Sequence, residues 1–417
     1  MKVNSVGSAR TSATPRARSS SLALELAPPF PRAREISRRV LDDDARDEDA
    51  RVPRVVVVVI VLVVVVVVIV AHPAARVVVA LWRTVTAISR LALMSLARAL
   101  TADDPARMNL RRRFVRYRAS SSAPTAPPRV GVVFEREDGS RDDDDDGDVY
   151  DVVCARTGAP ATTMRELASC EIASYTRTAH KARDVRVMVP MDEDAQILCV
   201  GKNYLEHVGE VDSSIPGISR AKTPERPIVF PKSRACAIVD GEEIDAHGRE
   251  DVDYEGELAC VLGGFDAREI EDADDEDAVC ARCVFGWTVA NDVTARKLQK
   301  EHQQWFLGKS CDTFCPMSPW VIGADERPWS ALNGSRLETR VNGELRQTAD
   351  VRDMIFNVAT LIKTMSRYQT LRPGDVILCG TPSGVGAGQK PEPKFLRPGD
   401  EVAISIDGVG RLTNRVR

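Results

Sequence analysis

Residues 252–263 read VDYEGELACVLG, and this stretch carries most of what can be inferred about the fold. Alternate side chains of an extended strand point to the same face, so Glu255 and Glu257 lie side by side. The apolar continuation LACVLG indicates that the strand enters a buried sheet. Two neighbouring carboxylates repel one another unless a cation or a proton lies between them. The pair is therefore either an oxygen site for a hard cation or the solvated face of an edge strand.

A further acidic residue ends the apolar strand of FGWTVANDVTARKLQ. Asp292 is either a third metal ligand or, like Asn291, the N-cap of a helix that begins near Thr294. Arg296 and Gln299 are three residues apart in that helix, so they share a face and reach toward whatever Asp292 holds.

The segment KNYLEHVGEV follows the apolar strand ILCVG and places His207 three residues before Glu210 on a predicted helix. A carboxylate beside an imidazole raises its basicity and selects its tautomer, as a general base requires. The alternative is a surface His–Glu pair without a catalytic role. The position directly after a buried strand favours a functional site.

Two more segments carry polar groups suited to a site. LGKSCDTFCP contains Lys309, and Gly380 and Thr381 open the glycine-rich loop GTPSGVGAG. Backbone amides of such a loop can hold an anionic oxygen. The loop lacks the Gly-Lys-Ser/Thr ending of a nucleotide-binding loop and no helical pattern follows it, which argues against a nucleotide site.

Residues 190–417 alternate short apolar strands with Gly/Pro turns and are predicted to form the catalytic domain, mostly β with helices on its rim. LRPGD occurs twice, each time before a strand, and VNGE (341–344) is a hairpin turn signal. One amphipathic helix is predicted within residues 354–368, with Ile355, Val358, Leu361 and Ile362 on its buried face.

Residues 129–189 are predicted to form a small β-rich N-terminal domain that begins with a hairpin between 130–137 and 148–156. Residues 1–128 are expected to be a transit-like, low-complexity leader outside the fold. A basic, Ser-rich start and a second Arg-rich stretch after Met108 favour targeting to the mitochondrion or another organelle, with the cytoplasm as the alternative.

An apolar run from Val55 to Ala71, almost pure valine, has three interpretations. It is a transmembrane helix, a long buried strand, or the translation product of repetitive DNA that translation from Met94 or Met108 would omit. Valine is a poor helix former and the run is long for a strand, which favours the third interpretation. A membrane anchor is therefore not expected.

The 417 residues include 57 basic and 61 acidic side chains, for a formal net charge of −4. This balance gives no field that would recruit nucleic acid or an anionic membrane, and it suits a small polar substrate. All 10 cysteines lie at or beyond Cys154 with irregular spacing, as in a protein with reduced thiols. Cys280/Cys283 and Cys311/Cys315 are better explained as small buried side chains than as a zinc site.

Nine motifs in chain order resemble the fumarylacetoacetate hydrolase family over residues 129–417: GKNYLEHVGEV, PIVFPKS, VDYEGELACVLG, TVANDVTARKLQ, WFLGKSCDTFCPMSPWV, VNGELRQ, MIF, PGDVILCGTPSGVG and FLRPGDEV. The wording of DTFCP and KPEPKFLRPGDEV is most similar to the branch of the fumarylacetoacetate hydrolase domain-containing protein 2. The resemblance implies an α+β, mostly β fold, a mixed β-sandwich roll of the fumarylacetoacetase C-terminal type, and a homodimer.

The resemblance also implies roles for the residues singled out above. Glu255, Glu257 and Asp292 would bind one Mg²⁺, with Mn²⁺ or Ca²⁺ as alternatives, and water would complete its coordination. The substrate would contact Lys309 and the set Arg296, Gln299, Gly380 and Thr381. His207 and Glu210 would lie on a lid and activate water, while Lys309 would stabilise an enolate.

The activity that follows is hydrolysis of a carbon–carbon bond in a small dioxo or acylpyruvate-type acid. Decarboxylation or keto–enol isomerisation of an oxo acid at the same site, or a silent family member, are the alternatives.

Overall fold

The computed structural model describes residues 110–120, 122, 126–136, 148–213, 223–265, 270, 275–302 and 304–417. Within these ranges, none of the helices has the length and apolar character needed to cross a bilayer. The valine-rich run and the basic start of the chain lie outside the described residues, so the expectations for them stay predictions.

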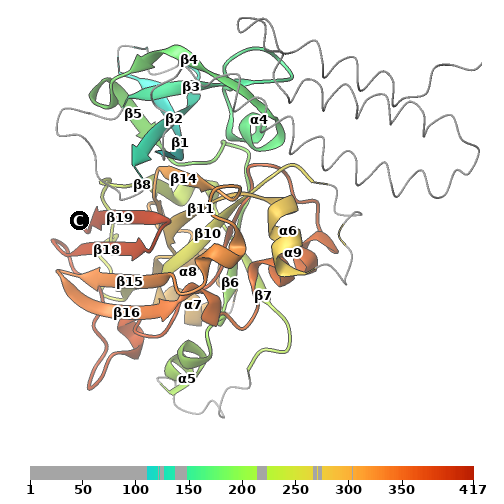
Figure 1. The fold of residues 1–417 in the computed structure, drawn as a ribbon. Helices are drawn as coiled ribbons and strands as arrows, with labels where there is room; N and C mark the ends of the chain where they lie inside the picture. Colours follow the sequence, from blue (N-terminus) through green and yellow to red (C-terminus); the bar gives the residue numbers. More distant parts are fainter. Residues whose placement is uncertain are drawn as a thin grey trace, which may run out of the picture. The chain divides into compact units, whose positions relative to one another are not determined.

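Figure 1 shows the helices and strands of the described residues. The N-terminal elements are β1 (Leu110–Ala119), β2 (Arg129–Arg136), β3 (Val149–Cys154), α4 (Met164–Ser169), β4 (Ile172–His180) and β5 (Val185–Met188). The next are β6 (Ile197–Gly201), α5 (Leu205–Ser213), β7 (Ile228–Lys232), β8 (Ala237–Val239), β9 (Val252–Asp253), β10 (Gly256–Leu262), α6 (Glu276–Cys283), β11 (Val284–Asn291) and β12 (Thr294–Ala295).

The C-terminal elements begin with α7 (Arg296–Glu301), α8 (Phe306–Lys309), β13 (Cys315–Met317), β14 (Trp320–Gly323), β15 (Arg336–Val341) and β16 (Glu344–Asp350). They end with α9 (Val358–Ser366), β17 (Val376–Leu378), β18 (Glu401–Ile406) and β19 (Gly410–Arg415). The described residues are thus mostly β with short helices at the periphery, as the sequence predicted.

The described strands form one large sheet, one small four-stranded sheet and the two-stranded pair β9–β12. The large sheet has 13 strands and runs β4-β3-β2-β1-β14-β11-β10-β17-β6-β7, with β5, β8 and β13 attached beside this path. The small sheet has the order β16-β15-β18-β19 and is antiparallel throughout. Apolar side chains of both sheets belong to one core cluster, which includes Leu258 of β10 and Leu337 of β15. This packing holds β10 at the centre of the catalytic region.

The N-terminal boundary differs from the prediction. Strand β1 lies inside the segment 1–128 that was expected to be leader, yet it pairs with β2, β5 and β14. Phe114 and Val115 of β1 are buried. Arginines at 111, 112, 113, 116 and 118 hid the apolar alternation, and the strand was assigned to a targeting peptide on composition. Because β1 joins β2 to β14, residues 129–189 share a sheet with the catalytic region.

The turns behave as their residues predict. Asn342 and Gly343 have φ of 52° and 79°, and they connect β15 to β16 as a tight hairpin. In the two LRPGD turns, Gly374 and Gly399 have φ of 83° and 94°. Helix α9 is shorter than its apolar pattern, because the Asn357 side chain caps it by accepting from the Thr360 amide at 2.8 Å. Val358, Leu361 and Ile362 are buried as expected, whereas Ile355 precedes the helix.

Residues of β1 are expected to contribute to stability as core residues do. Phe114 is buried and its ring centroid lies 5.1 Å from that of Phe285, so Phe114→Ala should lower the free energy of unfolding by about 3–5 kcal/mol. Urea denaturation measures this loss, with Tyr368→Ala, at an exposed site, as the control. Equal midpoints for the two variants would show that β1 is not part of the folded core.

Candidate functional site

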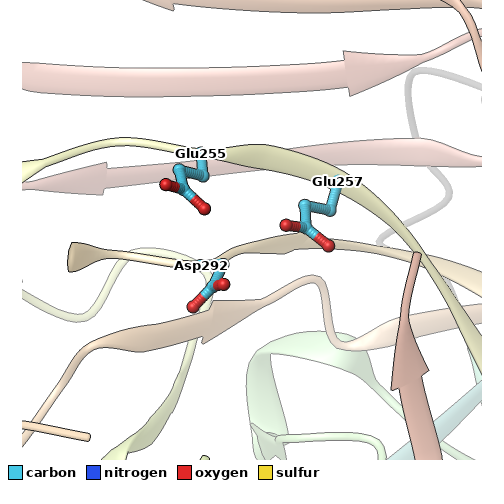
Figure 2. Close-up of side chains that lie close together, drawn as sticks. All are labelled: Glu255, Glu257 and Asp292. Atoms are coloured by element: carbon cyan, nitrogen blue, oxygen red, sulfur yellow. The ribbon is translucent and has the colours of Figure 1, made fainter. Parts of the chain in front are cut away.

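The three predicted metal ligands meet at one end of the β10–β11 pair. Glu257 of β10 is opposite Ala290 of β11, and the Asp292 amide donates to the Glu255 carbonyl at 2.8 Å. One oxygen from each of the three carboxylates lies within 4.8 Å of the other two (Figure 2), and the three residues are 4%, 1% and 1% exposed. The burial of Glu255 and Glu257 rules out a solvated strand face. Asp292 is not a helix cap either, because the N-cap of α7 is Ala295 and no side chain caps it.

Polar contacts fix the backbone around the carboxylates. The Asn291 side chain accepts from the Glu255 amide at 2.9 Å, and the Gly380 amide donates to Glu257 Oε2 at 2.6 Å. Gly380 has φ of 98°, and a Cβ there would lie 2.6 Å from the Asn203 Cβ. A glycine is therefore required where the loop after β17 approaches Glu257.

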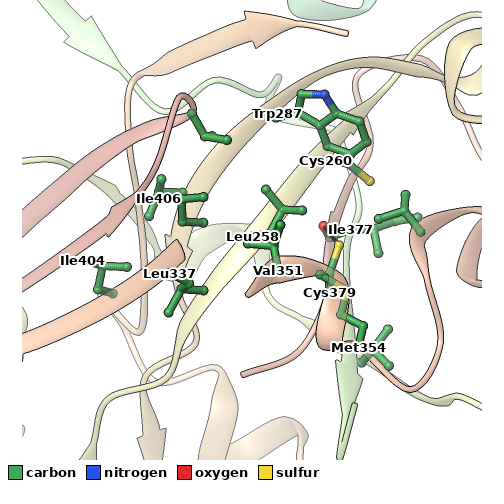
Figure 3. Close-up of a cluster of buried hydrophobic side chains, with 14 of the residues drawn as sticks. Leu258, Cys260, Trp287, Leu337, Val351, Met354, Ile377, Cys379, Ile404 and Ile406 are labelled. Atoms are coloured by element: carbon green, nitrogen blue, oxygen red, sulfur yellow. Dashed lines mark hydrogen bonds between the residues drawn. The ribbon is translucent and has the colours of Figure 1, made fainter. Parts of the chain in front are cut away.

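The opposite face of β10 anchors the site in the core. Leu258 and Cys260 alternate with the ligands and point into an apolar cluster with Trp287 and Ile377 (Figure 3). Strand β10 lies between β11 and β17, so both of its edges are hydrogen bonded. Glu257 is thus mounted on a strand with little freedom to shift, while Glu255 directly precedes β10 and Asp292 directly follows β11.

Three cationic side chains surround the carboxylates. Lys309 Nζ donates to Glu255 Oε2 and to Asp292 Oδ2, each at 2.6 Å. Arg296 Nη2 lies 2.7 Å from Glu255 Oε1. Lys232 Nζ donates to Asp292 Oδ1 at 2.6 Å. Sequence reasoning missed Lys232, although its place at the end of the strand in PIVFPKS, beside a predicted site, was a usable signal.

These charges and the burial shift the pKa values of the site in different directions. Burial acts to raise the pKa of Glu255, but Lys309 and Arg296 outweigh it and lower this pKa to about 2. Burial, then Asp292 and Glu255, raise the pKa of Glu257 well above its usual value. Burial acts to lower the pKa of Lys309, but Asp292 and Glu255 raise it, which favours the ammonium form that donates hydrogen bonds to both carboxylates.

The donor set fits a hard divalent cation. Three carboxylates and no sulfur or nitrogen ligand form the cluster, which suits Mg²⁺, Mn²⁺ or Ca²⁺. Burial and the neighbouring carboxylates Asp292 and Glu255 raise the pKa of Glu257, and a cation in the cluster would offset that repulsion. The four cysteines considered for zinc, 280, 283, 311 and 315, are free, and among the described residues they form no metal-ligating group.

The predicted base pair lies on α5. His207 is buried, and its Nδ1 is 3.4 Å from Glu210 Oε2. Both Glu210 oxygens accept from the Gly384 amide at 3.0 Å. The Gly380 amide of the same glycine-rich loop donates to Glu257 Oε2, so one loop contacts both the His207–Glu210 pair and the carboxylate cluster. The pair is therefore not a solvated surface feature.

Arg296 and Gln299 share a face of α7, as predicted, but they contact each other and a third residue. Arg296 Nη1 lies 3.3 Å from Gln299 Oε1, and Arg296 Nε donates to Asp253 Oδ2 at 2.7 Å. Asp253 was not predicted, although it stands two positions before Glu255 in the same strand pattern. The guanidinium thus bridges Asp253 and Glu255.

Thr381 is held by its neighbours: its hydroxyl donates to the Gly256 carbonyl at 3.0 Å and accepts from Gln347 Nε2 at 2.8 Å. The amides of the glycine-rich loop bind carboxylates of the protein itself. Gly384 donates to Glu210, and Gly386 and Ala387 donate to Asp253. These three loop amides are therefore hydrogen bonded to side chains of the protein, which agrees with the argument against a nucleotide site.

Comparisons with known proteins agree with this fold and site. Residues 196–417 match the family described as fumarylacetoacetate (FAA) hydrolase C-terminal. The chain is 45% identical over 239 residues to oxaloacetate tautomerase YisK of Bacillus subtilis (strain 168), covering 56% of this chain and 73% of that protein. It is 36% identical over 235 residues to an uncharacterised protein of Staphylococcus aureus (strain USA300), covering 56% and 72%.

Solved structures give the same result. The 2-hydroxyhepta-2,4-diene-1,7-dioate isomerase from Mycobacterium marinum is similar with a TM-score of 0.51 and 28% identity, covering 73% of this chain and 97% of that chain. The fumarylacetoacetate hydrolase from Exiguobacterium antarcticum is similar with a TM-score of 0.53 and 32% identity, covering 73% and 99%.

The fold and the carboxylate cluster define a metal-site enzyme class whose relatives include hydrolases, isomerases and tautomerases. The chain belongs to the fumarylacetoacetate hydrolase family. The relatives named above are bacterial and lend no support to the predicted organelle targeting.

Removing a ligand is expected to abolish metal binding. Glu255→Ala, Glu257→Ala and Asp292→Ala each delete one of the three clustered carboxylates, so calorimetry should show lost Mg²⁺ binding and activity should fall with it. Circular dichroism should show a retained fold. Unchanged Mg²⁺ affinity in any two of the three variants contradicts the assignment.

Mg²⁺ affinity is expected to rise with pH. Because burial and two neighbouring carboxylates raise the pKa of Glu257, the cation must displace a proton from it at pH values below that raised pKa. Titration in buffers of different ionisation enthalpy should reveal this proton release, and Glu257→Gln should remove it. Proton uptake, or an affinity independent of pH from 5 to 8, contradicts the prediction.

Proposed function

We propose that the chain is a divalent-metal-dependent enzyme that interconverts the keto and enol forms of a small 2-oxo dicarboxylic acid such as oxaloacetate. The observation that carries the proposal is a buried carboxylate cluster contacted by the Lys309 ammonium and joined, through the 380–388 loop, to the His207–Glu210 pair. The similarity to an oxaloacetate tautomerase supports the choice of reaction. We infer Mg²⁺ as the cation, because three carboxylates leave room for several water ligands.

A cation held by Glu255, Glu257 and Asp292 would polarise the keto group and the adjacent carboxylate of a 2-oxo acid. His207, oriented by Glu210, would remove a proton from the carbon next to the keto group. Lys309 would donate a proton or a hydrogen bond to the oxygen on which negative charge develops. Ketonisation is the same sequence in reverse, with His207 returning the proton to carbon.

Hydrolysis of an acylpyruvate is the second candidate, and the same His207–Glu210 pair supports it. The pair would deprotonate a water that attacks the distal carbonyl, and Lys309 would stabilise the departing enolate. Decarboxylation needs no attacking water and would use the pair to protonate the enolate. A homodimer and a location in an organelle remain predictions from the sequence.

His207→Ala should reduce tautomerisation of oxaloacetate by about two to four orders of magnitude, because it removes the general base. Mg²⁺ affinity should stay near that of the wild type, since His207 is not one of the clustered carboxylates. The rate is measured from the enol absorbance in the presence of Mg²⁺. Retention of the rate within a few-fold would overturn the assigned role.

A histidine away from the cluster is the matched control. His247 also lies near a carboxylate, with Nδ1 3.8 Å from Asp245 Oδ1, and its φ of 51° is compatible with asparagine. His247→Asn should leave the rate unchanged. A wild type that cleaves acylpyruvates with Mg²⁺ but leaves oxaloacetate enol untouched would select hydrolysis instead.

A further inference from the structure

One buried carboxylate beside the site is neither in the ligand cluster nor in the base pair. Asp253 is fully buried, two residues before Glu255. Its Oδ1 accepts from the Tyr254 amide at 2.9 Å and from the Gly386 amide at 2.6 Å. Its Oδ2 accepts from Arg296 Nε at 2.7 Å and from the Ala387 amide at 3.0 Å. Both oxygens therefore join the glycine-rich loop to another part of the site.

The loop that Asp253 binds from one side also binds helix α5. The Gly384 amide donates to both oxygens of Glu210 on α5. A Cβ at Gly388 would overlap the Glu210 carboxylate, and a Cβ at Gly386 would lie 2.6 Å from Asp253 Oδ1. The glycines at 386 and 388 thus let two carboxylates approach one short loop closely.

On its other side, Asp253 shares Arg296 with a metal ligand. The guanidinium donates to Asp253 through Nε, while its Nη2 lies 2.7 Å from Glu255 Oε1. Arg296 is thereby held between two carboxylates, and Asp253 limits how far it can move toward Glu255. A chain of contacts runs from Glu210 through residues 384–387 to Asp253, and from there through Arg296 to Glu255.

We propose that Asp253 is a positioning residue. It couples the hydrogen bonds between Glu210 and the 384–388 loop to the position of Arg296 beside the metal ligand Glu255. The inference rests on the proposed metal-dependent function. Docking of α5 through Glu210 then fixes the loop, and the loop fixes the guanidinium beside the cation site. Loss of Asp253 frees both the loop and Arg296 at once.

Asp253→Asn is the test variant. Both carboxylate oxygens face N–H donors, so the amide group of asparagine meets a donor in either orientation. Asp375→Asn is the matched control, because Asp375 is also fully buried and accepts from the Gln196 amide at 2.9 Å and the Arg372 amide at 2.9 Å. Arg372 lies in the turn before β17 and Gln196 directly precedes β6, and neither contacts the carboxylate cluster.

We expect Asp253→Asn to weaken Mg²⁺ binding by about 10- to 100-fold, as found for residues that orient metal ligands, and to raise KM as well as lower kcat. Hydrogen exchange of the amides at 384, 386 and 387 should become faster. Asp375→Asn should leave these three amides and the Mg²⁺ affinity unchanged. Equal behaviour of the two variants would overturn the proposal.

A double-mutant cycle tests the coupling across the loop. If the loop transmits it, the effects of Glu210→Gln and Asp253→Asn on kcat/KM should be less than multiplicative, whereas Glu210→Gln and Asp375→Asn should multiply within about two-fold. Multiplicative effects in both cycles would overturn the proposal. If Asp253→Asn does not fold, Gly386→Ala replaces it, because its Cβ would push the loop away from Asp253. The same changes in exchange, Mg²⁺ affinity and kcat/KM are then expected.

The exchange measurement does not depend on the reaction. An inactive wild type would refute the proposed function, yet faster exchange at 384–387 in Asp253→Asn would still support the structural coupling. An active wild type with unchanged exchange and affinity in that variant would refute the coupling alone.

Discussion

The burial of three carboxylates side by side is the constraint on which the rest of this structure depends. Removing one such group from water costs several kcal/mol unless opposite charge and hydrogen bonds compensate. Glu255, Glu257 and Asp292 receive that compensation from two lysines, an arginine and a backbone amide. The hydrogen bonds of Lys309 and Lys232 to Asp292 use both of its oxygens, so an added cation must redistribute these contacts. Positive and negative side chains are accordingly balanced in the site, and binding a divalent ion together with an anionic substrate would preserve that balance.

The sheets supply the rigidity that this balance requires. Strand β10 is paired on both edges, and its apolar face packs against the core. Gly256 allows the small sheet to approach, since a Cβ there would contact Ile404 of β18 at 3.1 Å. The His207–Glu210 pair proposed as the base lies instead on α5, and the loop after β17 binds its carboxylate. The proposed metal ligands and the proposed base therefore lie on different elements.

Part of the fold could be predicted from local sequence patterns, because interactions between residues close in the chain determine these elements. Alternation, Asn-Gly and Pro-Gly turns, and helix periodicity depend on neighbours a few residues away, and β10, β15 and β16 formed where they were expected. Strand β1 was missed because its arginines resemble a targeting peptide, and only pairing with β2 and β14 shows that it belongs to the sheet. Helix α9 was overextended because an apolar pattern does not locate a cap.

For the site, the sequence by itself determined the residue types: an acidic pair at strand spacing, an aspartate at a strand end, a His–Glu pair at helix spacing and a glycine-rich loop. The tertiary structure decided which partners each group has. Lys232 and Asp253 gain their roles from residues 60 and 43 positions away, Asp292 and Arg296 respectively. The loop amides bind Glu210 and Asp253 because strands and helices distant in sequence meet there. Hydrogen bonds and charge pairs act over a few ångströms of space, and chain spacing reports such proximity only within one helix or strand.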